Sequence, residues 1–186
     1  TPIADTMACL LKLQEAGKIR SIGVSNVSPA ELQENLAHGP VASDQFWYSM
    51  LCRGAEKDIL PFCAQHNVAT LTYMSLQQGL LTGKIGMDRQ LTDGDVRNSI
   101  PWFKPANRQC VLDLLAGWAD LTDAHHCTLS QLAIAWTVAQ PGVTFALCGA
   151  RKAEHVRENA GGGEIELTPE ELARIRADVE ALGKPA

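Results

Sequence analysis

The sequence lacks both of the glycine-rich motifs that most often cradle a phosphate group. No G-x-G-x-x-G follows a predicted strand, and no G-x-x-x-x-G-K-[ST] occurs in the 186 residues. Neither the Rossmann nor the P-loop mode of nucleotide binding is therefore indicated. Any nucleotide site in this chain must use other residues.

Long apolar runs and concentrated positive charge are also missing. No stretch approaches the roughly 18 apolar residues of a membrane span, and residues 1–5 have neither the basic start nor the apolar core of a secretory signal. The net charge of −5 is modest and forms no basic stripe. We therefore expect a cytoplasmic protein with no membrane partner and no nucleic-acid partner.

Cysteines occur without any C-x-x-C pair. A chain of this length can build a sizeable core without disulfides, so we expect reduced, mostly buried thiols. Three consecutive residues, His125, His126 and Cys127, cannot face one ion on a helix, and we interpret the two histidines as surface residues near a helix C-terminus. No metal site is predicted. The six cysteines are Cys9, Cys52, Cys63, Cys110, Cys127 and Cys148.

Apolar patterns and capping boxes that begin at Ser28, Thr128 and Thr168 predict strands that alternate with helices in a single domain, residues 1–186. Strands are expected at 19–24, 41–45, 68–73 and 143–148. Helices are expected at 2–16, 28–37, 54–67, 107–124, 128–139 and 153–160, with a C-terminal helix within 164–186 that follows a glycine linker at 161–163. Parallel strands need crossover connections and a helix usually supplies them, so the alternation indicates an α/β fold with a parallel sheet.

Polar or aromatic residues follow the predicted strands. In parallel α/β folds the ligand site lies at the carboxyl ends of the strands. We therefore expect a ligand near Ser25, Asn26, Gln45 and Tyr73. The segment 74–106 is a glycine- and proline-rich loop of a length more typical of lids and binding loops.

The last predicted strand leads into Gly149, Ala150 and Arg151, which open a helix. Helix-start amides together with a guanidinium can hold an anion. A solvated arginine is an equally good interpretation from spacing alone, so both stay open at this point.

The same residues carry a resemblance to a known family. The segments at 17–26, 79–84, 95–99 and 149–151, with Glu158 and Asn159, resemble the carboxyl-terminal half of an aldo-keto reductase, in family order over nearly the whole chain. The family folds as a TIM-type (β/α)8 barrel and reduces aldehydes and ketones with NADPH. The resemblance therefore implies four strands with surrounding helices that form half of such a barrel.

The resemblance also implies roles for individual residues around NADP(H). Ser25, Asn26 and Gln45 look like ligands of the nicotinamide carboxamide, and Tyr73 looks like the ring that stacks on the nicotinamide. Leu76 and the loop to Lys84 look like the pyrophosphate cover. The adenosine and 2′-phosphate end would be held by Gly149, Ala150, Arg151, His155, Glu158 and Asn159. Each could instead have a purely structural role, as a turn cap, a core tyrosine or a solvated charge.

The chain departs from the family pattern at three points. Met74 stands where the family commonly has a serine directly after the stacking tyrosine, and His155 stands where many members have glutamine or arginine. The family's catalytic aspartate, tyrosine, lysine and histidine lie on strands that would precede Thr1, so no catalytic residue is assigned here.

Two hypotheses follow. The first is the cofactor-binding half of an NADPH-dependent aldo-keto reductase, inactive alone, whose intact enzyme would act on a small-molecule carbonyl substrate. The alternative is a catalytically inactive half-barrel that acts as an assembly or regulatory module. Because the predicted strands 19–24 and 143–148 would leave open edges, we expect self-association or pairing with an N-terminal half.

Overall fold

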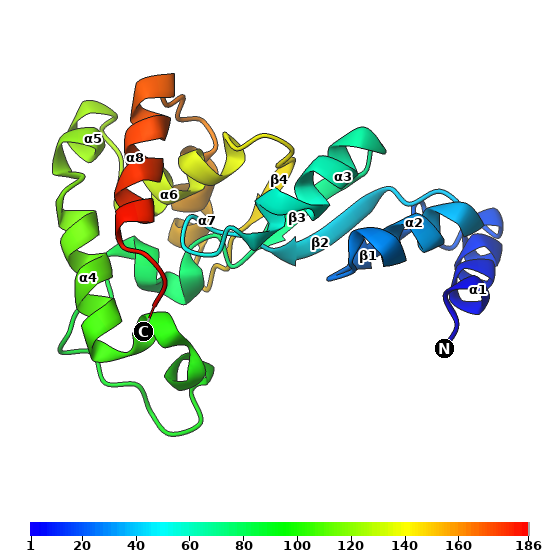
Figure 1. Ribbon diagram of the computed structural model, residues 1–186, viewed down its shortest axis with the longest axis horizontal. Coiled ribbons are helices and arrows are strands. Elements are labelled where there is room, and N and C mark those ends of the chain that lie inside the picture. Colours follow the sequence, from blue (N-terminus) through cyan, green and yellow to red (C-terminus); the bar gives the residue numbers. More distant parts are fainter. Residues whose placement is uncertain (186) are drawn as a thin grey trace.

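The computed structural model describes residues 1–185. Within that range, four strands form one sheet in the order β1-β2-β3-β4, and every neighbouring pair is parallel (Figure 1). The strands are β1 (Gly23–Ser25), β2 (Ser43–Trp47), β3 (Ala69–Tyr73) and β4 (Phe145–Leu147). The predicted α/β fold of four parallel strands with surrounding helices is confirmed, and β1 and β4 lie at the two edges.

Helices connect the strands and extend the fold beyond them. They are α1 (Ile3–Glu15), α2 (Pro29–His38), α3 (Ile59–Gln65), α4 (Pro105–Ala116), α5 (Ala119–Ala124), α6 (Leu129–Val138), α7 (Ala153–Gly162) and α8 (Pro169–Ala181). The predicted capping boxes are present at Ser28, Thr128 and Thr168, whose side chains each accept a hydrogen bond from the backbone three residues on. These boxes fix where three of the helices begin.

The strands are shorter or later than their apolar patterns predicted. The segment 19–22 forms no ladder, and β1 begins only at Gly23. The buried Ile22 in that segment contributes to the core, so its apolar character reflects packing rather than strand pairing. β2 begins and ends two residues later than predicted, and β4 is confined to three residues.

Three helix predictions were wrong in detail. The predicted helix 54–67 breaks at Asp58, ahead of Pro61, into a short 3-10 turn η1 (Gly54–Lys57) and α3. The predicted helix 107–124 divides into α4 and α5 around Gly117. The glycines at 161–163 are no linker, because α7 continues through Gly162, where the lack of a side chain lets it pack closely on α6.

The segment after β3 is not a loose loop. It contains the 3-10 turns η2 (Gln77–Thr82), η3 (Val96–Ser99) and η4 (Pro101–Phe103) before α4 begins. Its apolar residues, including Leu80, Leu81, Trp102 and Phe103, belong to the main core. The long connection is therefore anchored by burial even though it has little regular structure.

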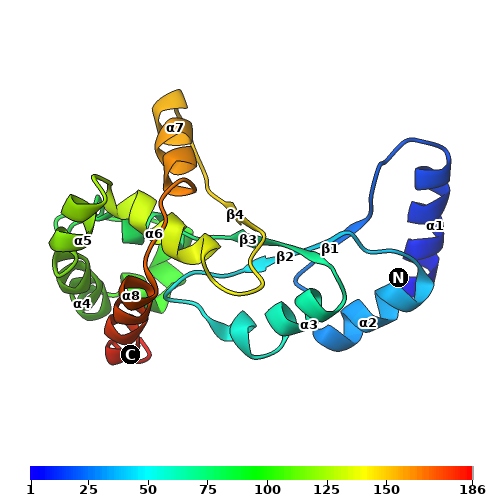
Figure 2. The same ribbon diagram turned by 90° about the horizontal axis from the view of Figure 1, so that it is seen from above.

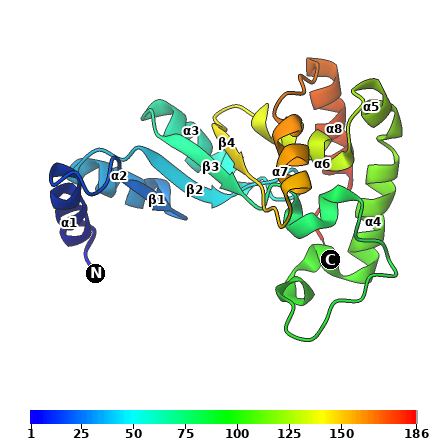
Figure 3. The ribbon, with the colours of Figure 1, turned by 180° about the vertical axis from the view of Figure 1, so that it is seen from behind.

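The two faces of the sheet differ in what covers them. Alternating residues of β2 and β3, among them Asp44 and Thr72, are buried, whereas the intervening Gln45 and Tyr73 are half-buried. Seen from above, α2 and α3 lie on one side of the strands and α7 projects on the other (Figure 2). The molecule is elongated, with α1 at one end and α4, α5 and α8 grouped at the other (Figures 1 and 3).

Side-chain contacts fasten α8 to this second end. Trp118 donates from its indole N–H to Asp178, and His125 pairs with Glu171 at 2.9 Å. His125 and His126 follow the last residue of α5, as predicted, and His126 is exposed, whereas His125 is only partly exposed because it contacts α8. The prediction of mostly buried cysteines was wrong: of the six, all free, only Cys63 is buried among the described residues.

Residues 1–185 contain neither a membrane-spanning helix nor a metal-binding cluster. None of the helices there combines the length and the apolar character that crossing a membrane requires. No group of three histidine, cysteine, aspartate or glutamate side chains in that range is arranged to hold a metal ion.

Candidate cofactor site

Four predicted residues gather at the carboxyl ends of the first three strands, and we call them the strand-end group: Ser25, Asn26, Gln45 and Tyr73. Ser25 is the last residue of β1 and pairs in register with Gln45 of β2, while Tyr73 is the last residue of β3. Gln45 lies two residues inside β2, so the prediction that it ends its strand was wrong. Strand pairing still brings it beside Ser25.

A chain of hydrogen bonds links the strand-end group. The Tyr73 hydroxyl donates to Asn26 Oδ1 at 2.8 Å, and the Asn26 amide donates to Ser25 Oγ at 2.8 Å. Ser25 Oγ in turn donates to the backbone carbonyl of Gln45 at 2.9 Å. The tyrosine ring is therefore held across the end of the sheet, above β2, by contacts that begin on β1.

The strand-end group also contains one unusual backbone conformation and one side chain without a partner. Asn26 has a φ of 56°, a left-handed conformation that asparagine tolerates better than most residues. Within the described residues, the Gln45 side-chain amide has no hydrogen-bond partner in the protein. A free amide, with its donor and its acceptor, can recognise a ligand carboxamide.

A cavity of about 860 Å³ continues from the strand-end group toward β4 and α7. Tyr73 belongs to both features, so the two adjoin at this residue. One side is formed by residues of the connection 74–97, which we call the loop wall, and the other by residues 147–159, which we call the helix wall. The predicted site residues on the cavity are Tyr73, Leu76, Gly149, Ala150, Arg151, His155, Glu158 and Asn159.

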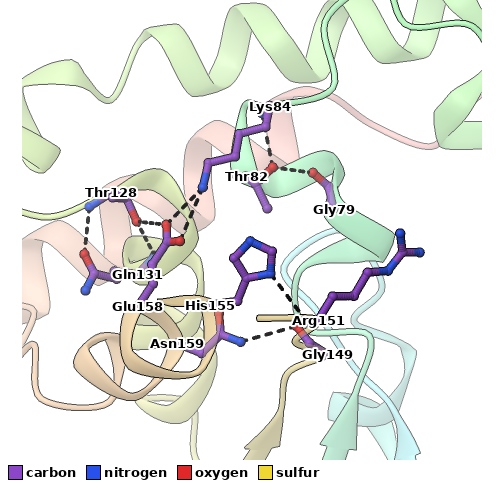
Figure 4. Close-up of polar contacts among 10 residues, drawn as sticks. All are labelled: Gly79, Thr82, Lys84, Thr128, Gln131, Gly149, Arg151, His155, Glu158 and Asn159. Carbon is purple, nitrogen blue, oxygen red and sulfur yellow. Dashed lines mark hydrogen bonds and ion pairs between the residues drawn. The ribbon is translucent and has the colours of Figure 1, made fainter. Parts of the chain in front are cut away.

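The helix wall is ordered by its own contacts. The backbone N–H of Arg151 donates to His155 Nδ1 at 3.5 Å, and Asn159 donates to the carbonyl of Gly149 at 3.4 Å. Figure 4 shows the His155 ring between Glu158 and Arg151, with the Arg151 side chain extended away from the others. Among residues 1–185, the Arg151 guanidinium has no hydrogen bond or ion pair, so it is available to a ligand anion.

Glu158 joins the two walls. Its carboxylate pairs with Lys84 of the loop wall at 3.3 Å and accepts a hydrogen bond from Thr128, the cap of α6, at 2.9 Å (Figure 4). Burial alone would raise the pKa of Glu158, but the hydrogen bonds from Thr128 and Lys84 outweigh it and lower the pKa below its usual value. Glu158 is therefore charged near neutral pH and acts as a latch between the loop and the helix.

The loop wall begins with unusual backbone geometry. Met74, Gln77 and Gln78 all have φ between 47° and 59°, which non-glycine residues seldom adopt. Buried Gln77 accepts a hydrogen bond from Ser49, and the Gln78 amide contacts the Met74 sulfur at 3.3 Å. The hydroxyl of Ser75 turns back to the carbonyl of Thr72. The Ser75 hydroxyl proton is therefore used within the protein, and Met74 has no hydroxyl to offer in its place.

The cavity residues that were missed from the sequence include two arginines and a serine: Arg89, Arg97 and Ser130. Arg97 lies in a matching motif, and its pairing with Asp95 two residues earlier was the signal that could have found it. The position of Arg89 depends on how the loop folds, and Ser130 is the second residue of α6, which is distant in the sequence. No local pattern in the sequence marks either residue.

The fold and the site together can be compared with known proteins. The model of the aldo/keto reductase family matches residues 1–180. The chain belongs to this family. A solved aldo/keto reductase relative, the glycerol dehydrogenase of Gluconobacter oxydans, superposes with a TM-score of 0.91 at 33% identity and covers 100% of this chain and 56% of its own.

Curated relatives of this aldo/keto reductase chain differ in the cofactor that their names state. The NADH-specific methylglyoxal reductase of Escherichia coli is 38% identical over 182 residues, 98% of this chain and 55% of that protein. An NADP(+) aldo-keto reductase of Schizosaccharomyces pombe is 30% identical over 179 residues, 95% of this chain and 53% of that protein. The chain thus spans about half the length of the relatives it matches.

Proposed function

We propose that this chain is the cofactor-binding half of an NADPH-dependent aldo-keto reductase that reduces aldehydes or ketones to alcohols. Its four strands would be half of a (β/α)8 barrel. The observation that carries the proposal is that Tyr73 lines the cavity and is also hydrogen-bonded to Asn26 of the strand-end group. A dinucleotide carries a nicotinamide at one end and an adenosine at the other, and this chain offers an amide-rich group and a cationic group on the two sides of Tyr73.

The residues present fit a nicotinamide cofactor. The unpartnered Gln45 amide suits a carboxamide, and the half-buried Tyr73 ring offers a face for stacking. The guanidinium of Arg151 suits a phosphate. Arg151 is the reason for proposing NADP(H) rather than NAD(H), because the 2′-phosphate of NADP(H) would give its guanidinium an anionic partner.

The cofactor, when bound, would supply the hydride that reduces the carbonyl carbon. The residues of this chain would bind and orient it: Ser25, Asn26 and Gln45 would fix the carboxamide, and Tyr73 would set the plane of the ring. Proton transfer is assigned to no residue here, because the family's proton-transferring residues have no counterpart among the matching motifs. The cytoplasmic location stays a prediction.

Fluorescence titration tests this proposal. The chain has four tryptophans, and Trp47 ends β2 in register with Tyr73. We expect NADPH to quench tryptophan emission with micromolar affinity. A matched Gln45→Leu variant should bind NADPH more weakly but 2′,5′-ADP, which has no nicotinamide, as before. Absence of quenching by NADPH and by NADH would contradict the proposal.

A second function, as an assembly module, is favoured by the exposed apolar residues of β4. Phe145 is 56% exposed and Leu147 is 38% exposed, and both lie on an edge strand. Open edges and apolar side chains invite a partner, either another copy of this chain or an N-terminal half. Light scattering after size exclusion would count against this function if the chain were a stable monomer.

A further inference from the structure

A buried arginine lies behind the loop wall. Arg108, on α4, is 7% exposed, and within residues 1–185 it forms no ion pair with a carboxylate. Its guanidinium donates to the backbone carbonyls of Arg89 at 3.0 Å and Met87 at 3.2 Å, and its Nε is buried without a partner. Burying a charge is costly unless it is hydrogen-bonded, so these two carbonyls are strongly preferred partners.

The contacts of Arg108 fix the course of the loop at residues 87–89. These residues lie in no helix or strand, and α4 supplies the contact from 19 positions further along the chain. Because the carbonyl of Arg89 is held, the direction in which its side chain leaves the backbone is restricted. Arg108 therefore helps to determine where the Arg89 guanidinium lies.

Arg89 lines the cavity, and its charge is only weakly compensated. Within the described residues its guanidinium makes no hydrogen bond or ion pair. The pKa of Asp95 is lowered to about 2, chiefly by hydrogen bonds from Arg97 and only slightly by the charge of Arg89. Asp95 is thus already paired with Arg97, and Arg89 keeps most of its capacity to bind an anion.

The charged residues of the cavity divide into paired and free groups. Lys84 is paired with Glu158 and Arg97 with Asp95, whereas Arg89 on the loop wall and Arg151 on the helix wall have no ion pair among residues 1–185. Each of these two free guanidinium groups suits an anion with several acceptor oxygens. A phosphate group has that chemistry.

We propose that Arg89 is a second phosphate-binding residue of the cofactor site and that Arg108 is its positioning residue. This inference rests on the proposed function, because the phosphate is taken to be one of the dinucleotide. The shared chemistry is a phosphate oxygen on a guanidinium. The phosphate that contacts Arg89 is either the 2′-phosphate, which only NADP(H) carries, or the diphosphate, which NAD(H) and NADP(H) both carry.

The test uses the full chain with 2′,5′-ADP and ADP as probes, and calorimetry measures the affinity for each. Arg89→Met should weaken binding of 2′,5′-ADP about tenfold. Arg157→Met removes the same charge from an exposed position on α7 that is outside the cavity lining, and should change binding less than twofold. Loss for 2′,5′-ADP alone assigns Arg89 to the 2′-phosphate. Equal loss for both probes assigns it to the 5′-phosphate that both probes carry, which corresponds to the adenosine side of the cofactor's diphosphate.

Unchanged affinity for both probes in Arg89→Met, with a wild-type chain that binds them, would overturn the inference and leave the proposed function intact. A wild-type chain that binds neither probe and does not respond to NADPH would instead remove the proposed function, and this inference with it. The two failures are therefore distinguishable.

A double-mutant cycle tests the positioning role of Arg108. Arg108→Met should weaken 2′,5′-ADP binding about fivefold in the wild-type background but less than twofold when Arg89→Met is already present. Arg108→Lys, which keeps a donor for one carbonyl, should recover part of the affinity. Urea unfolding checks that each variant is folded. Equal losses in both backgrounds would show that Arg108 acts only through general stability.

Discussion

The strand-end group and the cavity beyond it are built by different means. Ser25, Gln45 and Tyr73 are placed by strand pairing, whose register fixes neighbours in space. The walls of the cavity are placed by side-chain contacts between segments far apart in the chain, such as Lys84 with Glu158 and Arg108 with Arg89. The first region is thus supported by the sheet, and the second by individual side chains.

The largest effect on stability is expected at Asp44, a buried residue of β2 next to the strand-end group. Asp44, beside Gln45 on β2, is buried, and neither carboxylate oxygen has a partner within the described residues. Burial raises its pKa to about 6, whereas an unfolded chain would have about 4. The folded state therefore favours the protonated form, and stability should fall as pH rises from about 4 to about 6 and stay low above that range.

Replacing this carboxyl should remove the pH dependence. At pH 8, Asp44→Asn should raise the free energy of unfolding by about 2 to 3 kcal/mol, and near pH 4 it should have little effect. The exposed Asp93→Asn serves as a control and should leave the pH profile of the wild type unchanged. Urea unfolding at several pH values measures both. If Asp44→Asn were destabilising at pH 8, the carboxylate would have a favourable role in the sheet.

The next effect concerns the helix wall. A side chain at Gly162 would place its Cβ 2.9 Å from Ile134 Cβ and 3.1 Å from Gln131 Cα, both on α6. Gly162→Ala gains helix propensity of about 1 kcal/mol, but overpacking of about 1 to 3 kcal/mol opposes it. We expect a net loss of stability of about 1 kcal/mol, with weaker 2′,5′-ADP binding.

Gly163→Ala is the matched control for this change. Its Cβ would approach only a backbone oxygen at 3.4 Å, so urea unfolding and probe binding should stay close to wild type. If both variants behaved alike, the close packing of α7 on α6 would not govern the helix wall. The strand-end group should be unaffected in either case, because neither glycine contacts it.

This contrast also explains how far the sequence could be interpreted. Parallel pairing and the three capping boxes follow from local patterns. The place of the ligand-binding residues followed from a general rule, that ligands of parallel α/β folds bind at the carboxyl ends of the strands. Strand bounds were less certain, since Ile22 is buried by packing rather than by a ladder.

The walls of the cavity lay further beyond sequence reasoning. Arg89 reaches the site because Arg108 holds its carbonyl, and that pairing depends on the tertiary course of the loop. The continuation of α7 through Gly162 follows from close contact with α6, whereas glycines in a row suggest a linker locally. Contacts that exist only in the folded chain leave no short motif.

Breaking the contacts of Glu158 that join the two walls should have a smaller effect. Lys84→Met removes an exposed partner and should cost less than about 1 kcal/mol of stability. Glu158→Gln also weakens the contact with Thr128 and should speed release of 2′,5′-ADP about threefold to fivefold, measured by stopped-flow fluorescence. Lys152→Met, on the same wall but outside the cavity, provides the charge control. Slower release in Glu158→Gln would mean that the latch hinders binding.

The smallest effect separates the two regions most directly. Tyr73→Phe keeps the ring but removes the hydroxyl that donates to Asn26, a hydrogen bond worth about 1 kcal/mol. Because the ring would then be less firmly held, NADPH affinity should fall about threefold, while 2′,5′-ADP affinity should not change. Parallel titrations with both probes measure this difference. If both affinities fell equally, the strand-end group and the cavity walls would respond as one unit. That result would contradict the independence of the two regions, which we infer because different contacts hold each of them.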